Sequence, residues 1–251
     1  MTRRAKARMT QRAKRGGRAR LLLLVVAGLG FALGAGKAPK AGKPAAGAEG
    51  PDTWYGERVT GGDTPLRVEY FWSKGRKLRS ETVVQGYPIT TLVSGEFYYV
   101  IDPIRQSGIA VRRSPAALEV DRAQPGARPF GNEAELLLAE KGAEKVRDET
   151  LDGRSVQIYR LTDDEGRREI WVTDDKLRLP LRIDAFVRNT GKHVRSDYVD
   201  WSRAIDLPDS FFEPDPRVQI ERIEYADYVK RSAEGPVGPA PVLFRELLHG
   251  K

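Results

Sequence analysis

The sequence predicts a mainly β fold with a few helices, built on one long antiparallel sheet. Three observations lead to this prediction. Strand-length runs rich in β-branched and aromatic residues recur through both halves of the chain, and turn clusters separate them. Apolar and polar residues alternate within these runs, which is typical of a sheet with one buried face and one wet face. The gaps between neighbouring runs are too short for a crossover helix, so neighbouring strands should be antiparallel.

The first 36 residues are typical of an export signal. Nine lysines and arginines lie in residues 1–20, and residues 21–36 form an uncharged, largely apolar run. As a helix this run would span about 24 Å, which is short for a bilayer core of about 30 Å. We therefore expect a cleaved signal peptide, with an uncleaved anchor or a basic tail as alternatives. Residues 37–52 are rich in Ala, Gly, Pro and Lys and predict a flexible linker.

Most of the positive charge belongs to this leader. The net charge of the chain is +8, but the first 48 residues hold 12 basic residues and no acidic one. The other 203 residues hold 31 basic and 35 acidic residues, so the folded part is mildly acidic and a poor candidate for binding nucleic acid. The chain has no cysteine, which excludes disulfides, thiolate catalysis and a lipid-modified cysteine.

The N-terminal half predicts five strands before residue 113. They cover residues 66–72, 77–84, 89–93, 96–101 and 107–111. Residues 52–63 precede them and make a poor helix, because three of these residues are glycines.

Two helices are predicted in the middle of the chain. Residues 114–119 begin with a capping residue, Ser114, and place Pro115 at the first helical position. Residues 132–142 form the second, with Asn132 as its cap and Gly142 at its end. Since the helices interrupt the sheet at its midpoint, we expect them to lie across its concave face rather than to build a separate domain.

The C-terminal half predicts strands over residues 153–161, 168–172, 179–187 and 194–201. In these strands one parity is mainly apolar and should face the core. The residues of that parity are Val156, Ile158, Ile170, Val172, Leu181, Ile183 and Val187. Four aromatic residues have the other parity, and they either cover the outer face or touch a helix or a ligand there: Tyr159, Trp171, Phe186 and Trp201.

The chain ends with a strand-like run at 218–220, a Pro/Gly linker at 235–241 and an apolar segment at 242–248. The last segment is a docked helix, a partner-binding helix or a disordered tail.

The sequence offers little for catalysis. Its two histidines, His193 and His249, lie near no nucleophile in sequence, and the Gly-x-Ser-x-Gly elbow of hydrolases is missing. The two histidines also lack the short spacing that is typical of metal ligands. The acid pairs at 163–164 and 174–175 fall in predicted hairpin turns, where they favour the turn and solubility. We therefore expect a protein without catalytic activity and without a cofactor.

Five motifs carry a resemblance to a known family. They lie at residues 98–103, 169–172, 179–183, 198–201 and 207–214. Through them, residues 60 to about 230 resemble the LolA/LolB-like superfamily of bacterial outer-membrane lipoprotein-sorting proteins. The resemblance implies a curved, incomplete antiparallel barrel of about 10–11 strands, with helices over its open side. It implies a periplasmic protein that holds acyl chains of lipids or lipoproteins, or a sensor of the RseB-like kind.

The chain departs from the family at its start. Members usually begin with an amphipathic helix, for which only the glycine-rich residues 52–63 are available here. A lipid-binding relative of unknown cargo therefore fits better than lipoprotein carriage by LolA itself, and the missing cysteine argues against a LolB-type lipoprotein. On this reading residues 53–231 form the half-barrel, and residues 232–251 form a linker and a short helix.

The functional hypothesis is an apolar groove on the concave face. It would bind acyl chains because each buried methylene contributes roughly 0.8 kcal/mol. The predicted lining residues are Tyr70, Trp72, Tyr98, Val100, Ile158, Ile170, Val172, Leu181 and Ile183. The same residues also fit a packed core closed by the helices. The alternative function is a membrane-tethered sensor or scaffold that binds another envelope protein. We expect a monomer that lies in the periplasm, or is anchored in the inner membrane and faces it, and that binds no nucleic acid.

Overall fold

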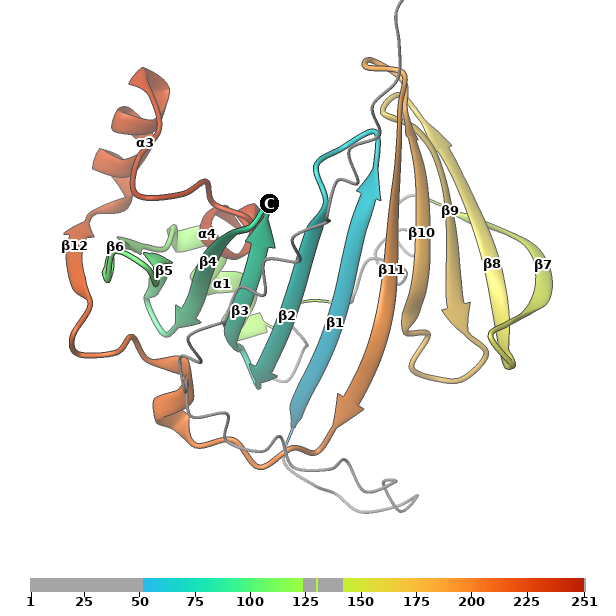
Figure 1. Ribbon diagram of the computed structural model, residues 1–251, viewed down its shortest axis with the longest axis horizontal. Helices are drawn as coiled ribbons and strands as arrows, with labels where there is room; N and C mark the ends of the chain where they lie inside the picture. The colour runs from blue at the N-terminus through green and yellow to red at the C-terminus, as the bar shows by residue number, and fades with distance from the viewer. Residues whose placement is uncertain (1–51, 124–129, 131–141, 251) are drawn as a thin grey trace, which may run out of the picture. The chain divides into compact units, whose positions relative to one another are not determined.

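The computed structural model describes residues 52–123, 130 and 142–250, which belong to one compact unit, Ala41–Lys251 (Figure 1). The strands are β1 Thr53–Gly62, β2 Arg67–Lys74, β3 Lys77–Val84, β4 Tyr87–Ser94, β5 Phe97–Asp102, β6 Ser107–Arg112, β7 Glu144–Leu151, β8 Arg154–Asp163, β9 Gly166–Thr173, β10 Pro180–Val187, β11 Lys192–Arg203 and β12 Gln219–Ile223. The helices are α1 Pro115–Ala123, η1 Asp209–Phe212, α3 Tyr225–Glu234 and α4 Arg245–His249. Of the helices in the described part, none has the length and hydropathy that a membrane crossing requires. The predicted leader and the predicted helix at 132–142, apart from Gly142, lie outside the described residues.

The strands form one sheet, with the first strand near its centre. Its order is β12-β6-β5-β4-β3-β2-β1-β11-β10-β9-β8-β7. Two meanders, β1 to β6 and β7 to β11, therefore meet where β1 pairs with β11. Every pair is antiparallel except β12 with β6. The prediction of a mainly β fold with one long, chiefly antiparallel sheet is confirmed, with twelve strands in an unclosed sheet rather than 10–11.

The central strand β1 was not predicted. Its three glycines were used only to argue that residues 52–63 make a poor helix, and a strand was not considered. Gly56 pairs with Phe71 on one side and with Trp201 on the other. A Cβ atom at Gly56 would lie 2.9 Å from the Trp201 ring and 3.3 Å from the Phe130 ring. The missing side chain thus leaves room for two aromatic rings that pack on the strand.

The parallel pairing of β12 follows from a long connection that crosses the sheet. After β11, residues 204–218 run to the far edge, and η1 lies against β3 and β4 on the way. Phe212 of η1 is fully buried. The chain then enters β12 beside β6, and the two strands run in the same direction.

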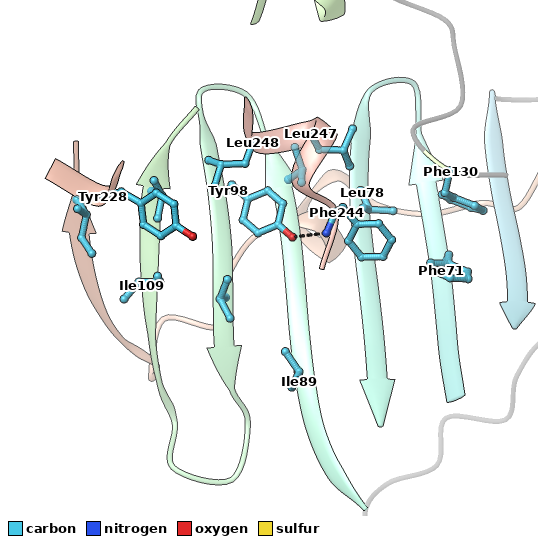
Figure 2. Packing of buried hydrophobic residues seen from close by; sticks show 14 of the residues in the cluster. Phe71, Leu78, Ile89, Tyr98, Ile109, Phe130, Tyr228, Phe244, Leu247 and Leu248 are labelled. Atoms are coloured by element: carbon cyan, nitrogen blue, oxygen red, sulfur yellow. Dashed lines mark hydrogen bonds between the residues drawn. The ribbon is translucent and has the colours of Figure 1, made fainter. Parts of the chain in front are cut away.

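One face of the sheet carries the main hydrophobic core and is called the core face here. It holds Phe71, Leu78 and Tyr98 from β2, β3 and β5 (Figure 2). The cap predicted for the first helix is confirmed, since Ser114 Oγ accepts a hydrogen bond from the Ala117 N–H at 3.0 Å.

The prediction that the alternating apolar residues of the C-terminal half share one face is wrong. Residues paired across an antiparallel ladder share a face. The β8–β9 hairpin pairs Ile158 with Trp171 and Tyr159 with Ile170. Ile158 and Ile170 therefore point to opposite faces. Of the aromatic residues treated as exceptions, Tyr159 packs with apolar neighbours on one face, and Trp171 and Trp201 do so on the other.

Candidate functional site

The nine predicted lining residues do not gather in one place. Tyr98 and Val100 lie in the main core on the core face. The other seven fall into three groups: Ile170, Val172 and Ile183 pack with Tyr159; Ile158 and Leu181 pack with Trp171; Tyr70 and Trp72 lie on the face opposite Phe71. Across β2 to β6 the core face is filled, not hollow.

The chain's own C-terminal end fills this face. Residues 236–250, called the C-terminal segment here, cross the core face after α3 and end in α4. The Phe244 ring meets the Phe71 ring edge-on, with ring centroids 5.8 Å apart. Leu247 and Leu248 are buried in the same cluster, at 5% and 0% exposure (Figure 2). Of the three alternatives for this segment, the structure shows the docked helix.

Tyr98 ties the segment to the sheet. Its side chain is fully buried, and its hydroxyl oxygen accepts a hydrogen bond from the Phe244 N–H at 3.1 Å (Figure 2). Burial raises the pKa of the Tyr98 hydroxyl, so the group stays neutral and able to hydrogen-bond. Sequence alternation placed Tyr98 inside, but no pattern in the sequence indicated its partner 146 residues away.

Arg113 and Ser114, between β6 and α1, bind the carbonyls at the end of α4. Arg113 Nε donates to the Leu247 carbonyl at 2.7 Å, and the Ser114 N–H donates to the Leu248 carbonyl at 3.0 Å. Ser114 Oγ donates to the carbonyl of His249 at 2.8 Å. These donors satisfy helix-end carbonyls that the short α4 cannot pair internally.

The Arg113 guanidinium is itself held by a carboxylate. It is 2% exposed and forms an ion pair with Asp121 of α1, with Nη1 and Oδ2 2.5 Å apart. Arg76, in the turn between β2 and β3, binds the same carboxylate at 2.8 Å. Burial alone would raise the pKa of Asp121, but the hydrogen bonds from Arg113 and Arg76 outweigh it and lower that pKa. The Arg113 anchor for α4 is therefore held by contacts with α1 and, through Asp121, with the turn between β2 and β3.

Gly250 fits the segment's last turn against α1. Its φ of +81° is left-handed, and a Cβ atom there would lie 2.4 Å from the Ala117 backbone nitrogen. Only glycine combines this backbone conformation with so close an approach. Together with the anchors at Tyr98, Arg113 and Ser114, it makes the docking of this segment specific.

A second polar group lies on the core face, beside Phe71, and was missed by sequence reasoning. Glu69 is 1% exposed, and its Oε2 lies 2.7 Å from Arg58 Nε and 3.1 Å from Arg67 Nε. Arg58 also donates to the Tyr198 hydroxyl at 3.0 Å and lies over the Phe71 ring. Sequence reasoning could not find it, because residues 52–63 were not predicted as a strand. The alternation along residues 66–72 placed Tyr70 and Trp72, not Glu69, on the inner side.

The histidines lie apart from any nucleophilic cluster. His193 packs on the Phe186 ring, with centroids 4.9 Å apart, and His249 Nδ1 lies 2.9 Å from the Tyr225 hydroxyl. In the ranges that the structure describes, no three His, Asp or Glu side chains are placed to hold a metal ion.

The described fold is similar to several solved structures. An uncharacterized conserved protein from Thermus thermophilus is 12% identical, with a TM-score of 0.48 over 68% of this chain and 90% of that chain. The MucA/MucB complex of Pseudomonas aeruginosa is 12% identical, with a TM-score of 0.41 over 68% of this chain and 58% of that chain. An outer membrane lipoprotein-sorting protein domain from Vibrio parahaemolyticus is 13% identical, with a TM-score of 0.30 over 64% of this chain and 89% of that chain.

No protein-family model and no curated protein sequence matches this chain.

Proposed function

We propose that the chain is an exported, non-catalytic protein that binds acyl chains of a lipid or lipoprotein on its core face, in the place that its C-terminal segment holds. One observation supports this most. The apolar face of β2 to β6 is covered by a chain end that contributes Phe244, Leu247 and Leu248. An acyl chain offers the same apolar contacts, at roughly 0.8 kcal/mol for each buried methylene.

Exchange is reasonable because the occupant is short and lies at the end of the chain. α4 has five residues, and an isolated helix of that length is not stable in water. Its docking therefore depends on its contacts with the face itself, and a ligand that replaces those contacts can displace it. No covalent step is involved.

The wider arrangement that we propose is LolA/LolB-like. In it α1 and α4 roof the concave face of the open sheet, and residues 53–231 form the half-barrel. Residues 1–36 act as a signal peptide or anchor, residues 37–52 act as a linker, and the monomeric protein works in the periplasm without a cofactor. Of the predicted lining residues, Tyr98 and Val100 keep this role, since they lie beneath the C-terminal segment.

Palmitic acid binding, measured by calorimetry on the exported chain and two variants, tests the proposal. Leu248→Ala removes a fully buried side chain of the C-terminal segment, and Ile158→Ala removes one from a separate cluster. Each should lower the free energy of unfolding by about 2–5 kcal/mol. Leu248→Ala should also raise the apparent palmitate affinity about tenfold or more, because the binding-competent state becomes more populated.

Ile158→Ala should leave that affinity unchanged, so a gain common to both variants would reflect general loosening. If palmitate binds none of the three proteins, or binds the Leu248→Ala variant more weakly than the natural chain, the core face is not an acyl-chain site.

A further inference from the structure

The face opposite the core carries a run of aromatic rings across β1, β2 and η1. We call it the aromatic surface and define it by Tyr55, Tyr70, Trp72 and Phe211. The Trp72 ring centroid lies 5.4 Å from that of Tyr55, 6.4 Å from that of Tyr70 and 5.5 Å from that of Phe211. All four side chains are half-buried, and none belongs to a hydrophobic core cluster of the described residues.

Two carboxylates lie directly beside these rings. Glu57 of β1 pairs with Tyr70 on one side and with Asp200 of β11 on the other. Like charges directly opposite each other across a sheet destabilise it. Burial, followed by the negative charge of Glu57, the hydrogen bond to Glu57 and then the negative charge of Asp200, raises the pKa of the neighbouring Tyr55 hydroxyl. The surface therefore combines half-buried aromatic rings with two adjacent carboxylates.

The cations nearby do not neutralise this pair. Arg79 of β3 binds Glu81 at 2.8 Å and lies over the Phe211 ring, and Lys74 binds Asp209 at 2.8 Å. Within the described part of the chain, Glu57 and Asp200 accept hydrogen bonds from Tyr55 and Ser202, and neither forms an ion pair.

We propose that the aromatic surface docks a lysine- or arginine-bearing segment of a partner protein. Cationic side chains are attracted to the faces of Trp and Tyr rings, and they form ion pairs with carboxylates. A bound cation would also compensate the repulsion between Glu57 and Asp200. Local rules of sheet stability tend to be broken at functional sites, and this like-charge pair fits that pattern. The inference goes beyond acyl-chain binding and concerns the other face of the sheet.

Titration of the exported chain with an octalysine peptide tests the inference, with octaglutamate as the opposite-charge probe. The double variant Glu57→Gln with Asp200→Asn should weaken octalysine binding about tenfold, the loss expected for two ion pairs and their cation–π contacts. Its melting temperature should stay level or rise, because the repulsion is removed. Tyr70→Leu keeps an apolar side chain without the ring face and should also weaken binding.

The matched control is Asp152→Asn with Asp164→Asn, which removes the same charge from two exposed turn residues that form no ion pair within the described part of the chain. If this control weakens octalysine binding as much as the Glu57 and Asp200 variant does, only net charge matters and the inference is wrong. Absence of octalysine binding to the natural chain would also overturn it. Palmitate binding should be the same in all these variants, so failure here and failure of the proposed function are distinguishable.

Discussion

A single hydroxyl group, that of Tyr98, joins the centre of the core face to the end of the chain. A polar atom buried this deeply needs a partner, and the Phe244 N–H provides it. The Phe244 N–H in turn has no acceptor within α4, because Phe244 lies at the N-terminal boundary of that helix. The hydrogen bond therefore fixes the position of the C-terminal segment along the sheet.

Replacement of Tyr98 by Phe tests this bond. The variant keeps the ring but leaves the Phe244 N–H buried without a partner, so we expect the free energy of unfolding to fall by about 1–3 kcal/mol. Tyr99→Phe is the control, since Tyr99 is half-buried on the other face of the same strand and should change stability by less than about 0.5 kcal/mol. Urea denaturation measures both, and equal losses would contradict the role given to Tyr98.

At this scale the sequence predicted that Tyr98 and Val100 point inward, but not what they meet. It expected Tyr70 and Trp72 on the same inner face, whereas they lie on the face opposite Phe71. Tyr98 and Val100 alternate with other residues along β5 and are buried as expected. A filled face and a hollow one produce the same alternation, so the contact with Phe244 was not predictable. Ile158 and Ile170 were assigned to one face because parity is defined only within a strand. The register of the hairpin between them places them on opposite faces.

Among the elements, α4 depends most on its neighbours. Two of its five residues, Leu247 and Leu248, are buried, and their carbonyls accept hydrogen bonds from Arg113 and Ser114. Its last residue, His249, packs against the rings of Tyr225 and Tyr228 in α3. One short helix thus links β6, α1 and α3.

This link should weaken in mild acid. Burial, and then the positive charge of Arg245, lower the pKa of His249 below its usual 6.5. The folded state therefore holds the neutral ring, whereas the unfolded chain binds a proton below about pH 6.5. Stability due to His249 is complete above that pH and is lost as the pH falls further. We expect the melting temperature to fall between about pH 6.5 and 5 in the natural chain.

The variant His249→Gln should show a smaller fall over the same pH range. Carboxylates such as Asp209 and Asp215, whose pKa values are lowered to about 2, keep their charge there and do not contribute. Identical pH profiles for the two proteins would exclude His249 as the sensitive group.

The central strand provides a further test at the level of elements. Gly56→Ala would push a methyl group into the Trp201 ring and should cost about 1–3 kcal/mol of stability by overpacking. Gly61→Ala on the same strand has only an ordinary contact, 3.8 Å from Leu66, and should be neutral or slightly stabilising. Thermal unfolding of the two variants compares them. Equal effects would mean that Gly56 does not make room for the ring.

Most strands joined by tight turns were predictable from sequence, since turn residues and alternation are local signals. Two strands, β1 and β7, are covered by none of the predicted strand ranges, and both lack those signals. β1 contains glycines whose purpose is visible only once Trp201 packs on it, and seven of the eight residues of β7 are exposed, so it shows no buried face. The parallel pairing of β12 depends on a connection across the sheet, which local patterns do not encode.

At the scale of the whole molecule, the sheet joins two meanders through one seam. β1 and β11 pair over nine positions with one register shift, and Arg58 reaches Tyr198 across a sequence separation of 140 residues. Each meander is local in sequence, whereas the seam is not. Folds with many such distant pairings form slowly, because the chain loses the entropy of loop closure before the distant contacts stabilise it.

This seam has a consequence for the way the protein is made. The N-terminal meander leaves the ribosome first, with one side of β1 complete and the other side waiting for a strand that is synthesised last in its own meander. During that interval the nascent chain presents a row of unsatisfied amide groups, which invites mispairing with other chains. A holdase chaperone that binds the nascent chain, or export of the polypeptide in an extended state, would protect the free edge of β1 until β11 can pair with it.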